Sequence, residues 1–168
     1  SQEYGVEFVG APAEFFQGIS LFAQGHLSRG LSVMETHLKH WERSSCTMRF
    51  VSLGAVLARI YTKVALKETR GSWSTMLHNP GGMLKLGFGC RGRAMSWLDR
   101  CAQKAEHSGM KPVLGQIRLL QGRLLAASGR VDQAREALGN ALELLEGCRA
   151  SEDAARAKKE LLKLQRSG

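Results

Sequence analysis

The feature that most constrains the fold of this chain is a pattern of small and large apolar residues that occurs twice, 104 positions apart. Gly18 matches Gly122, and the correspondence continues in step along the chain. The further matches are Leu21 with Leu125, Gly25 with Gly129, Gly30 with Ala134, Met34 with Leu138, and Leu38 with Leu142. In both copies the apolar residues recur every three or four positions, as on one face of an α-helix. Small residues fall where two helices must approach closely, so each copy predicts a helical hairpin.

The second copy, from Gly115 to Glu146, resembles a tetratricopeptide repeat, which is a helical hairpin of about 34 residues. Gly129 is expected to end its first helix, because glycine is common just after a helix. The first copy departs from the pattern, since His37 stands where a small residue is expected and Gly30 replaces the usual alanine.

A third copy, in the middle of the chain, is divided by an insertion. Its first helix is predicted within residues 50–66, with Gly54 at the close contact, and its second within residues 93–109. Gly54 and Ala94 are 40 residues apart, whereas the matching positions of the best copy are 12 apart. About 28 residues are therefore inserted, and we expect an insertion or loop over residues 67–92.

These patterns predict an all-α fold in a single domain, residues 1–168. We expect a tetratricopeptide-like solenoid of about three hairpins, with the insertion in the middle one. Residues 1–10 are expected to form an extended lead-in, and the segment after Cys148 a final helix that caps the solenoid. No stretch alternates as a strand would, so no strand is predicted.

The arrangement also resembles a narrower class, the C-terminal tetratricopeptide-like region of large bacterial signalling proteins. Residues 58–66, 72–89 and 93–148 carry this resemblance. In such proteins a class III nucleotide cyclase domain, or a similar output domain, is followed by an AAA-type ATPase and a helical tail. The resemblance implies that this chain is a regulatory or interaction arm of an adenylate cyclase-associated or ATPase-linked protein. No Walker A pattern is present, and no activity carries over to the chain.

One motif points toward nucleotides. Gly87, Gly89 and Gly92 spell G-x-G-x-x-G, which binds phosphates when a strand precedes it and a helix follows. The preceding residues are too few and too glycine-rich for a buried strand, and no acid stands about 20 positions later to bind a ribose. We therefore interpret the glycine run as the connection through which the chain leaves the insertion and enters a helix at Arg93.

Neither catalysis nor metal binding is predicted. His37 and His40 could share a helix face, but no third ligand is evident. The four cysteines form no C-x-x-C pair, and no serine lies in a G-x-S-x-G turn. Cys101 is expected to be buried and Cys90 exposed. We expect no enzyme activity and no cofactor, while scattered thiols and the lack of a long apolar run predict a cytoplasmic chain without a membrane span.

The charge balance narrows the choice of partner. The chain has 24 Lys and Arg against 15 Asp and Glu, a formal net charge of +9. No aromatic residues are interleaved with the basic ones, which disfavours nucleic acid. We predict a non-catalytic protein-interaction and regulatory module for signal transduction, binding an acidic protein or peptide or other domains of its parent chain. The candidate partner-surface residues are Gln17, Arg59, Lys63, Arg118 and Arg123.

Two alternative functions stay open. The chain could be a sensor whose small-molecule ligand enters the concave groove near the insertion. The candidate pocket residues for this ligand are Trp73, Met76, Phe88 and Trp97. A weaker alternative is self-association as a homodimer, which exposure of Trp41 or Trp73 would favour.

Overall fold

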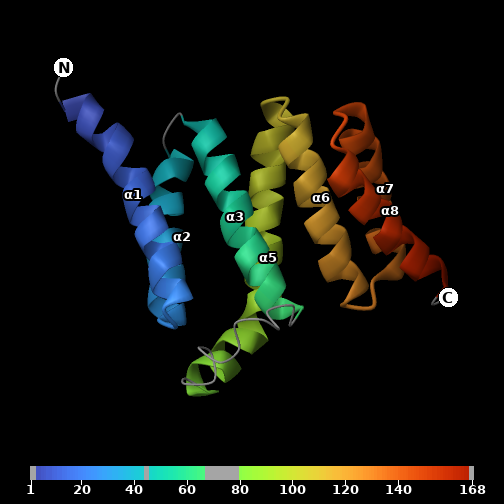
Figure 1. Cartoon of the computed structure of the whole chain (residues 1–168), viewed down its shortest axis with the longest axis horizontal. Coiled ribbons are helices and arrows are strands. Elements are labelled where there is room, and N and C mark those ends of the chain that lie inside the picture. The colour runs from blue at the N-terminus through green and yellow to red at the C-terminus, as the bar shows by residue number, and fades with distance from the viewer. Residues whose placement is uncertain (1–2, 44–45, 67–79, 167–168) are drawn as a thin grey trace.

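In the described part of the chain, the computed structural model is all-α, with seven helices and no strand (Figure 1). It describes residues 3–43, 46–66 and 80–166, with side chains from residue 13 onward in the first range and from residue 89 onward in the last. The helices are α1 (Glu3–Ala23), α2 (Leu27–Arg43), α3 (Thr47–Ala65), α5 (Pro80–His107), α6 (Lys111–Ala126), α7 (Val131–Gly147) and α8 (Ser151–Arg166). The prediction of an all-α fold is confirmed. None of the described helices combines the length and apolarity that a membrane crossing requires.

The helices pack as three successive hairpins and a final helix (Figure 1). Helix α1 packs on α2, α3 on α5, and α6 on α7, and α8 then packs on α7. Contacts between α2 and α3 and between α5 and α6 join the hairpins. Because α3 also contacts α6, and α6 contacts α8, the first helices of the second and third hairpins form one layer with α8.

The small residues of the repeat lie at the closest approaches of the outer hairpins. A Cβ added at Gly18 would lie 2.9 Å from the carbonyl oxygen of Gly30. A Cβ added at Gly122 would lie 3.3 Å from the carbonyl oxygen of Ala134. These are the pairs that the 104-residue offset superimposes, so the sequence pattern reports the same helix crossing in both hairpins.

The middle hairpin crosses at a different register. A Cβ added at Gly54 would collide with Sγ of Cys101, which lies about two helical turns beyond Ala94. Cys101 is fully buried, as expected, and burial raises the pKa of its thiol to about 12. The small-residue pattern of the outer hairpins matches Gly54 with Ala94, so it did not identify Cys101 as the residue that Gly54 contacts.

Two predicted irregular segments are helical. The proposed lead-in over residues 1–10 is wrong from Glu3 onward, where α1 begins. The glycine run, predicted to be a connection up to residue 92, lies inside α5, which begins at Pro80. Each glycine costs a helix roughly 1 kcal/mol relative to alanine, so local propensity does not explain this helix. Cys90, expected to be exposed, is only 1% exposed because it lies one helical turn before the buried Ala94, on the same face.

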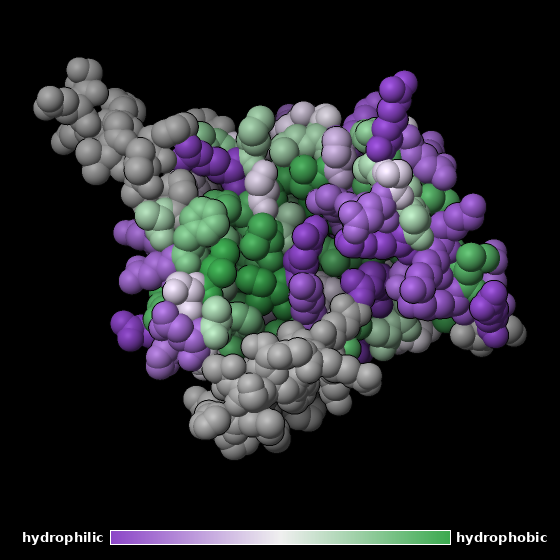
Figure 2. Space-filling view, in the orientation of Figure 1, coloured by the Kyte–Doolittle hydropathy of each residue, from purple (hydrophilic) through white to green (hydrophobic). Residues whose placement is uncertain are grey.

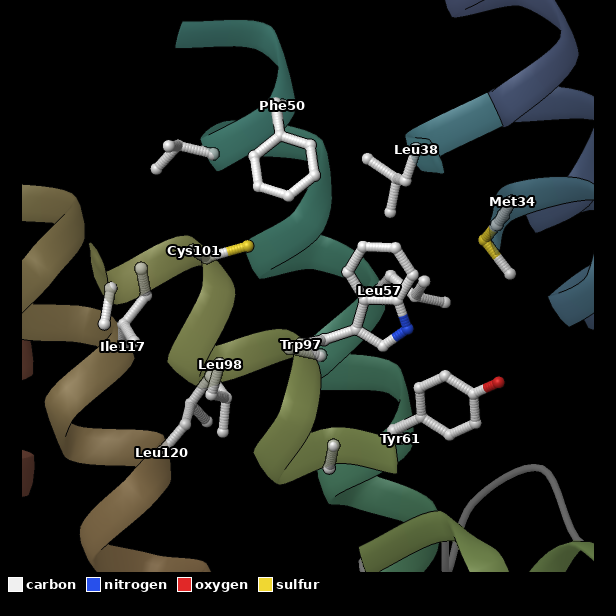
Figure 3. Close-up of a cluster of buried hydrophobic side chains, with 14 of the residues drawn as sticks. Met34, Leu38, Phe50, Leu57, Tyr61, Trp97, Leu98, Cys101, Ile117 and Leu120 are labelled. Carbon is white, nitrogen blue, oxygen red and sulfur yellow. The ribbon is translucent and has the colours of Figure 1, made fainter. Parts of the chain in front are cut away.

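The hydrophobic core is continuous from the first hairpin into α6. Figure 3 shows Trp97 of α5 directed toward Tyr61 of α3 and toward Met34 and Leu38 of α2. All four side chains are buried, so three helices share this part of the core. A second cluster joins α6, α7 and α8 around Leu138 and leaves α8 as the end of the stack.

Polar contacts fix neighbouring hairpins against one another. Arg100 of α5 donates from Nε to Oε1 of Glu42 in α2 over 2.8 Å, and its guanidinium lies 4.3 Å from the ring centre of Trp97. Between α5 and α6, Nε2 of the buried Gln121 donates to Oδ1 of Asp99 over 2.6 Å. Because these partners belong to different hairpins, the contacts fix how the hairpins stack on one another. They do not determine where each helix forms.

Candidate interaction groove

A groove of about 540 Å³ lies across α3, α6 and α8, and its walls are mainly basic. We call it the basic groove. Its charged lining residues are Arg59, Lys63, Arg123, Asp153, Arg156, Lys159 and Glu160. Its remaining lining residues are Thr62, Gln116, Leu119 and Leu120. With five basic and two acidic side chains, the groove has an excess of three positive charges.

Helical spacing explains how each element presents its cations. Arg59 and Lys63 are four residues apart on α3, so they lie one turn apart on the same exposed face. Arg156 and Lys159 are three residues apart on α8 and share a face in the same way. Arg123 stands in the last turn of α6, between these two helices. The groove thus gathers cations from positions about 100 residues apart in sequence.

The acids of the groove already have partners inside the protein. Asp153 accepts a hydrogen bond from Nε2 of Gln116 at 2.8 Å, and it forms an ion pair with Nη1 of Arg156 at 3.2 Å. Glu160 pairs with Nζ of Lys163 at 2.8 Å. With both carboxylates counted at full charge, the groove still has an excess of positive charge that attracts anions.

Three of the basic side chains are available to a ligand. Among the described residues, Arg59, Lys63 and Lys159 form no ion pair or hydrogen bond, and all three are exposed. The floor beneath them is closed, because Thr62 is buried and donates its hydroxyl to the Ala58 carbonyl at 2.7 Å. The groove therefore offers cationic hydrogen-bond donors above a floor whose polar hydroxyl already has a partner. This arrangement suits the binding of carboxylates more than a reaction with them.

The structure brings together three of the five predicted partner-surface residues, Arg59, Lys63 and Arg123. Arg118 lies on another side of α6, where Nη1 donates to Oε1 of Gln121 at 3.1 Å. Gln17 is exposed on α1 and does not line the groove. The sequence reasoning missed the contribution of α8. The sequence predicted only that the segment after Cys148 forms a capping helix, and none of its residues was among the predicted partner-surface residues.

Of the four predicted pocket residues, only Trp97 has a described side chain, and it lies in the core rather than in a pocket. Trp97 is 3% exposed, and its ring centre lies 6.2 Å from that of Phe50 within the core. Trp73 and Met76 lie outside the described residues, as does the side chain of Phe88. For self-association, Trp41 is only 8% exposed, so it does not offer the surface that this alternative needs.

A second cavity, of about 390 Å³, lies between α2 and the glycine run of α5. Its lining residues are Ser28, Leu31, Ser32, Glu35, Gly89, Cys90 and Arg93. Glu35 accepts a hydrogen bond from the hydroxyl of Tyr61 at 2.6 Å and a longer one from Nε1 of Trp97 at 3.5 Å. The cavity therefore presents an anchored carboxylate from one helix and a guanidinium from the other.

Two titrating groups around this cavity, the Tyr61 hydroxyl and the Cys90 thiol, have raised pKa values. Burial raises the pKa of Tyr61, and its hydrogen bond to Glu35 raises that pKa further. Burial also raises the pKa of the Cys90 thiol, although the nearby Arg93 acts in the opposite sense. Cys90 is therefore mostly thiol near neutral pH, which disfavours a nucleophilic role.

Comparison with protein-family models, with curated proteins and with solved structures finds no match to this chain. Within the residues that the structure describes, no group of three or more His, Cys, Asp or Glu side chains could hold a metal ion. The two concavities are therefore the features from which a function can be inferred.

Proposed function

We propose that this chain is a tetratricopeptide-like interaction module that binds an acidic protein segment in the basic groove. The observation that carries the proposal is the convergence of Arg59, Lys63, Arg123, Arg156 and Lys159 on one groove. Stacked helical hairpins commonly hold a peptide or another domain on the surface formed by successive helices. Small-residue crossings in the outer hairpins, at Gly18 and at Gly122, support the tetratricopeptide-like part of the proposal.

The experiment measures binding of a fluorescein-labelled, glutamate-rich peptide of ten residues by fluorescence anisotropy. The test variant is Arg59→Glu/Lys63→Glu, which reverses two cations of the groove. The matched control is Arg29→Glu/Lys39→Glu, which changes the net charge equally at exposed positions on α2. Exposed charge pairs contribute about 0.2–1 kcal/mol each, and reversal adds repulsion, so we expect roughly a tenfold loss of affinity in the test variant.

The control should retain most of the wild-type affinity, and raised salt should weaken binding through screening. Equal losses in the two variants would mean that net charge, rather than the groove, attracts the peptide. Undiminished binding at high salt would contradict the electrostatic argument itself.

We also propose that the module serves a larger signalling protein, as a cytoplasmic regulatory arm linked to a nucleotide cyclase or an ATPase. The support is the sequence resemblance over residues 58–66, 72–89 and 93–148. The full open reading frame tests this directly. A parent protein that encodes neither kind of catalytic domain would refute the proposed context but would leave the groove proposal intact.

A second candidate function, small-molecule sensing, is favoured by the cavity between α2 and α5. Glu35 and Arg93 offer opposite charges to one ligand, and Ser28 and Ser32 add hydroxyl groups, so the cavity suits a zwitterion such as a free amino acid. A thermal-shift survey of the amino acids tests this function. A ligand should raise the melting temperature with concentration in the wild type and not in Arg93→Met. The absence of any shift would exclude amino acids as ligands.

A further inference from the structure

Exposed and half-buried apolar side chains stand on α1 and on α3, the helix that also carries two cations of the basic groove. Phe16 of α1 is 59% exposed and Val56 of α3 is 39% exposed. Ile19, Leu53 and Ile60 are half-buried against the core. We call these five residues the apolar strip. In Figure 2, hydrophobic side chains gather where α1 and α3 lie in Figure 1, and hydrophilic ones gather toward α6 and α8.

Helix α3 carries the boundary between the two surfaces. Val56 and Ile60 are four residues apart, and each is followed three residues later by a cation, Arg59 and Lys63. Residues three and four apart are neighbours on a helix surface, so an apolar edge and a basic edge run side by side along α3. A ligand that crosses α3 therefore leaves one surface and enters the other directly.

The distance between the two surfaces sets the pattern that a ligand must carry. Neighbouring packed helices lie about 8–10 Å apart, so adjacent grooves are separated by about the same distance. An extended chain covers roughly 3.3–3.6 Å per residue, so about three residues span that separation.

Resting on the proposed function, we infer that the partner is an amphipathic segment in which apolar residues stand about three positions from a cluster of acids. Its apolar side chains cover Phe16 and Val56, and its carboxylates enter the basic groove. The negative charges of such a segment complement the positive charges of the basic groove. A second copy of the chain, at a net charge of +9, would bring basic surfaces together. The phosphates of a nucleic acid would leave the apolar strip uncovered.

Three labelled peptides test the inference by anisotropy. The first has a leucine block three residues from a glutamate block, the second has the same composition with leucine and glutamate interspersed, and the third is the acidic peptide alone. We expect the segregated peptide to bind about tenfold more tightly than the interspersed one, because only it can bury its apolar side chains while its acids reach the groove.

Paired variants locate the apolar contact. Phe16→Ser/Val56→Ser removes exposed apolar groups from the strip, and Val131→Ser/Leu162→Ser removes them elsewhere, from positions 36% and 45% exposed. The first variant should bind the segregated peptide about tenfold more weakly and the acidic peptide as the wild type does. The second should bind both as the wild type does. Circular dichroism at 222 nm confirms that both variants fold.

The outcomes separate this inference from the function on which it rests. Equal affinity for segregated and interspersed peptides, or no effect of Phe16→Ser/Val56→Ser, overturns the amphipathic partner. The basic groove survives that result if acidic-peptide binding still depends on Arg59 and Lys63. No binding of any peptide overturns both. A dimer in analytical ultracentrifugation that Phe16→Ser/Val56→Ser abolishes would assign the strip to a second copy and overturn the inference.

Discussion

Replacing Gly30 with alanine tests how closely α1 and α2 approach in the first hairpin. An added Cβ would lie 2.6 Å from the carbonyl oxygen of Gly18 and 2.7 Å from the amide nitrogen of Phe22. Both atoms belong to the main chain of α1 and cannot rotate away. Helix α1 must therefore shift as a body, which loosens the packing around Phe15 and Met34 in the core beneath it.

The size of the effect follows from two opposed contributions. Overpacking a tight contact costs about 1–3 kcal/mol, and the upper end applies because the contacted atoms are backbone. Alanine is favoured over glycine within a helix by about 1 kcal/mol. The net expectation for Gly30→Ala is a loss of about 2 kcal/mol in the free energy of unfolding, or a melting temperature lower by about 4–8 °C.

Gly139→Ala is the matched control, because it makes the same chemical change in the interior of α7 with nothing within 4 Å of the added Cβ. Without a clash only the propensity gain remains, so stability should rise by about 1 kcal/mol. Urea and thermal unfolding, followed by circular dichroism at 222 nm, measure both variants. Stacked hairpins can unfold in separate steps, so the loss is read from the transition of the first hairpin if several occur.

Gly30→Ala is expected to lower the free energy of unfolding, whereas Gly139→Ala is expected to raise it. A Gly30→Ala protein as stable as the wild type, beside a stabilised Gly139→Ala protein, would show that the first hairpin tolerates a wider crossing. The small-residue pattern would then lose its physical explanation in that hairpin.

Three further predictions concern other parts of the stack. Arg100→Ala should lower the free energy of unfolding by about 1–2 kcal/mol in urea titrations, since it removes the half-buried pair with Glu42 and the contact with the indole ring of Trp97. An unchanged urea midpoint would show that this pair does not stabilise the stacking of the hairpins. The wild type should lose stability relative to Tyr61→Phe as pH rises above about 10. The reason is that the unfolded tyrosine ionises there, while the buried one, with its raised pKa, keeps its proton. The same difference in melting temperature between the two proteins at about pH 9 and at about pH 11 would contradict this. Cys90 and Cys101 should resist a thiol reagent at about pH 8 in the native protein and react in urea, because both are buried and have raised pKa values; fast native labelling of either would refute their burial.

The basic groove shows how far sequence reasoning reached toward the site. Arg59, Lys63 and Arg123 were predicted to belong to a partner surface, and they do line one groove. That inference needed only helical periodicity and the order of the helices. Arg156 and Lys159 were missed because their part in the groove depends on how α8 packs behind α6, which no local pattern records.

The cavity at the glycine run shows the limit more sharply. The high glycine content and the lack of a preceding strand predicted a connection, yet the chain there is helical in α5. Local propensity opposes that helix, so composition alone did not predict it. Trp97 was assigned to a pocket for the same reason, since a sequence does not say which of its large apolar residues the neighbouring hairpin will cover.

The sequence by itself determined the all-α class, the hairpin pairing and the crossings at Gly18 and Gly122. These depend on residues three to twelve positions apart, whose relative placement a helix and its following turn dictate. The tertiary structure alone decided the register at Gly54, the helix through the glycine run, and the joining of α3, α6 and α8 around one groove. The register at Gly54 and the groove arise from contacts between helices distant in sequence, where the packing of whole surfaces outweighs the preference of any single segment.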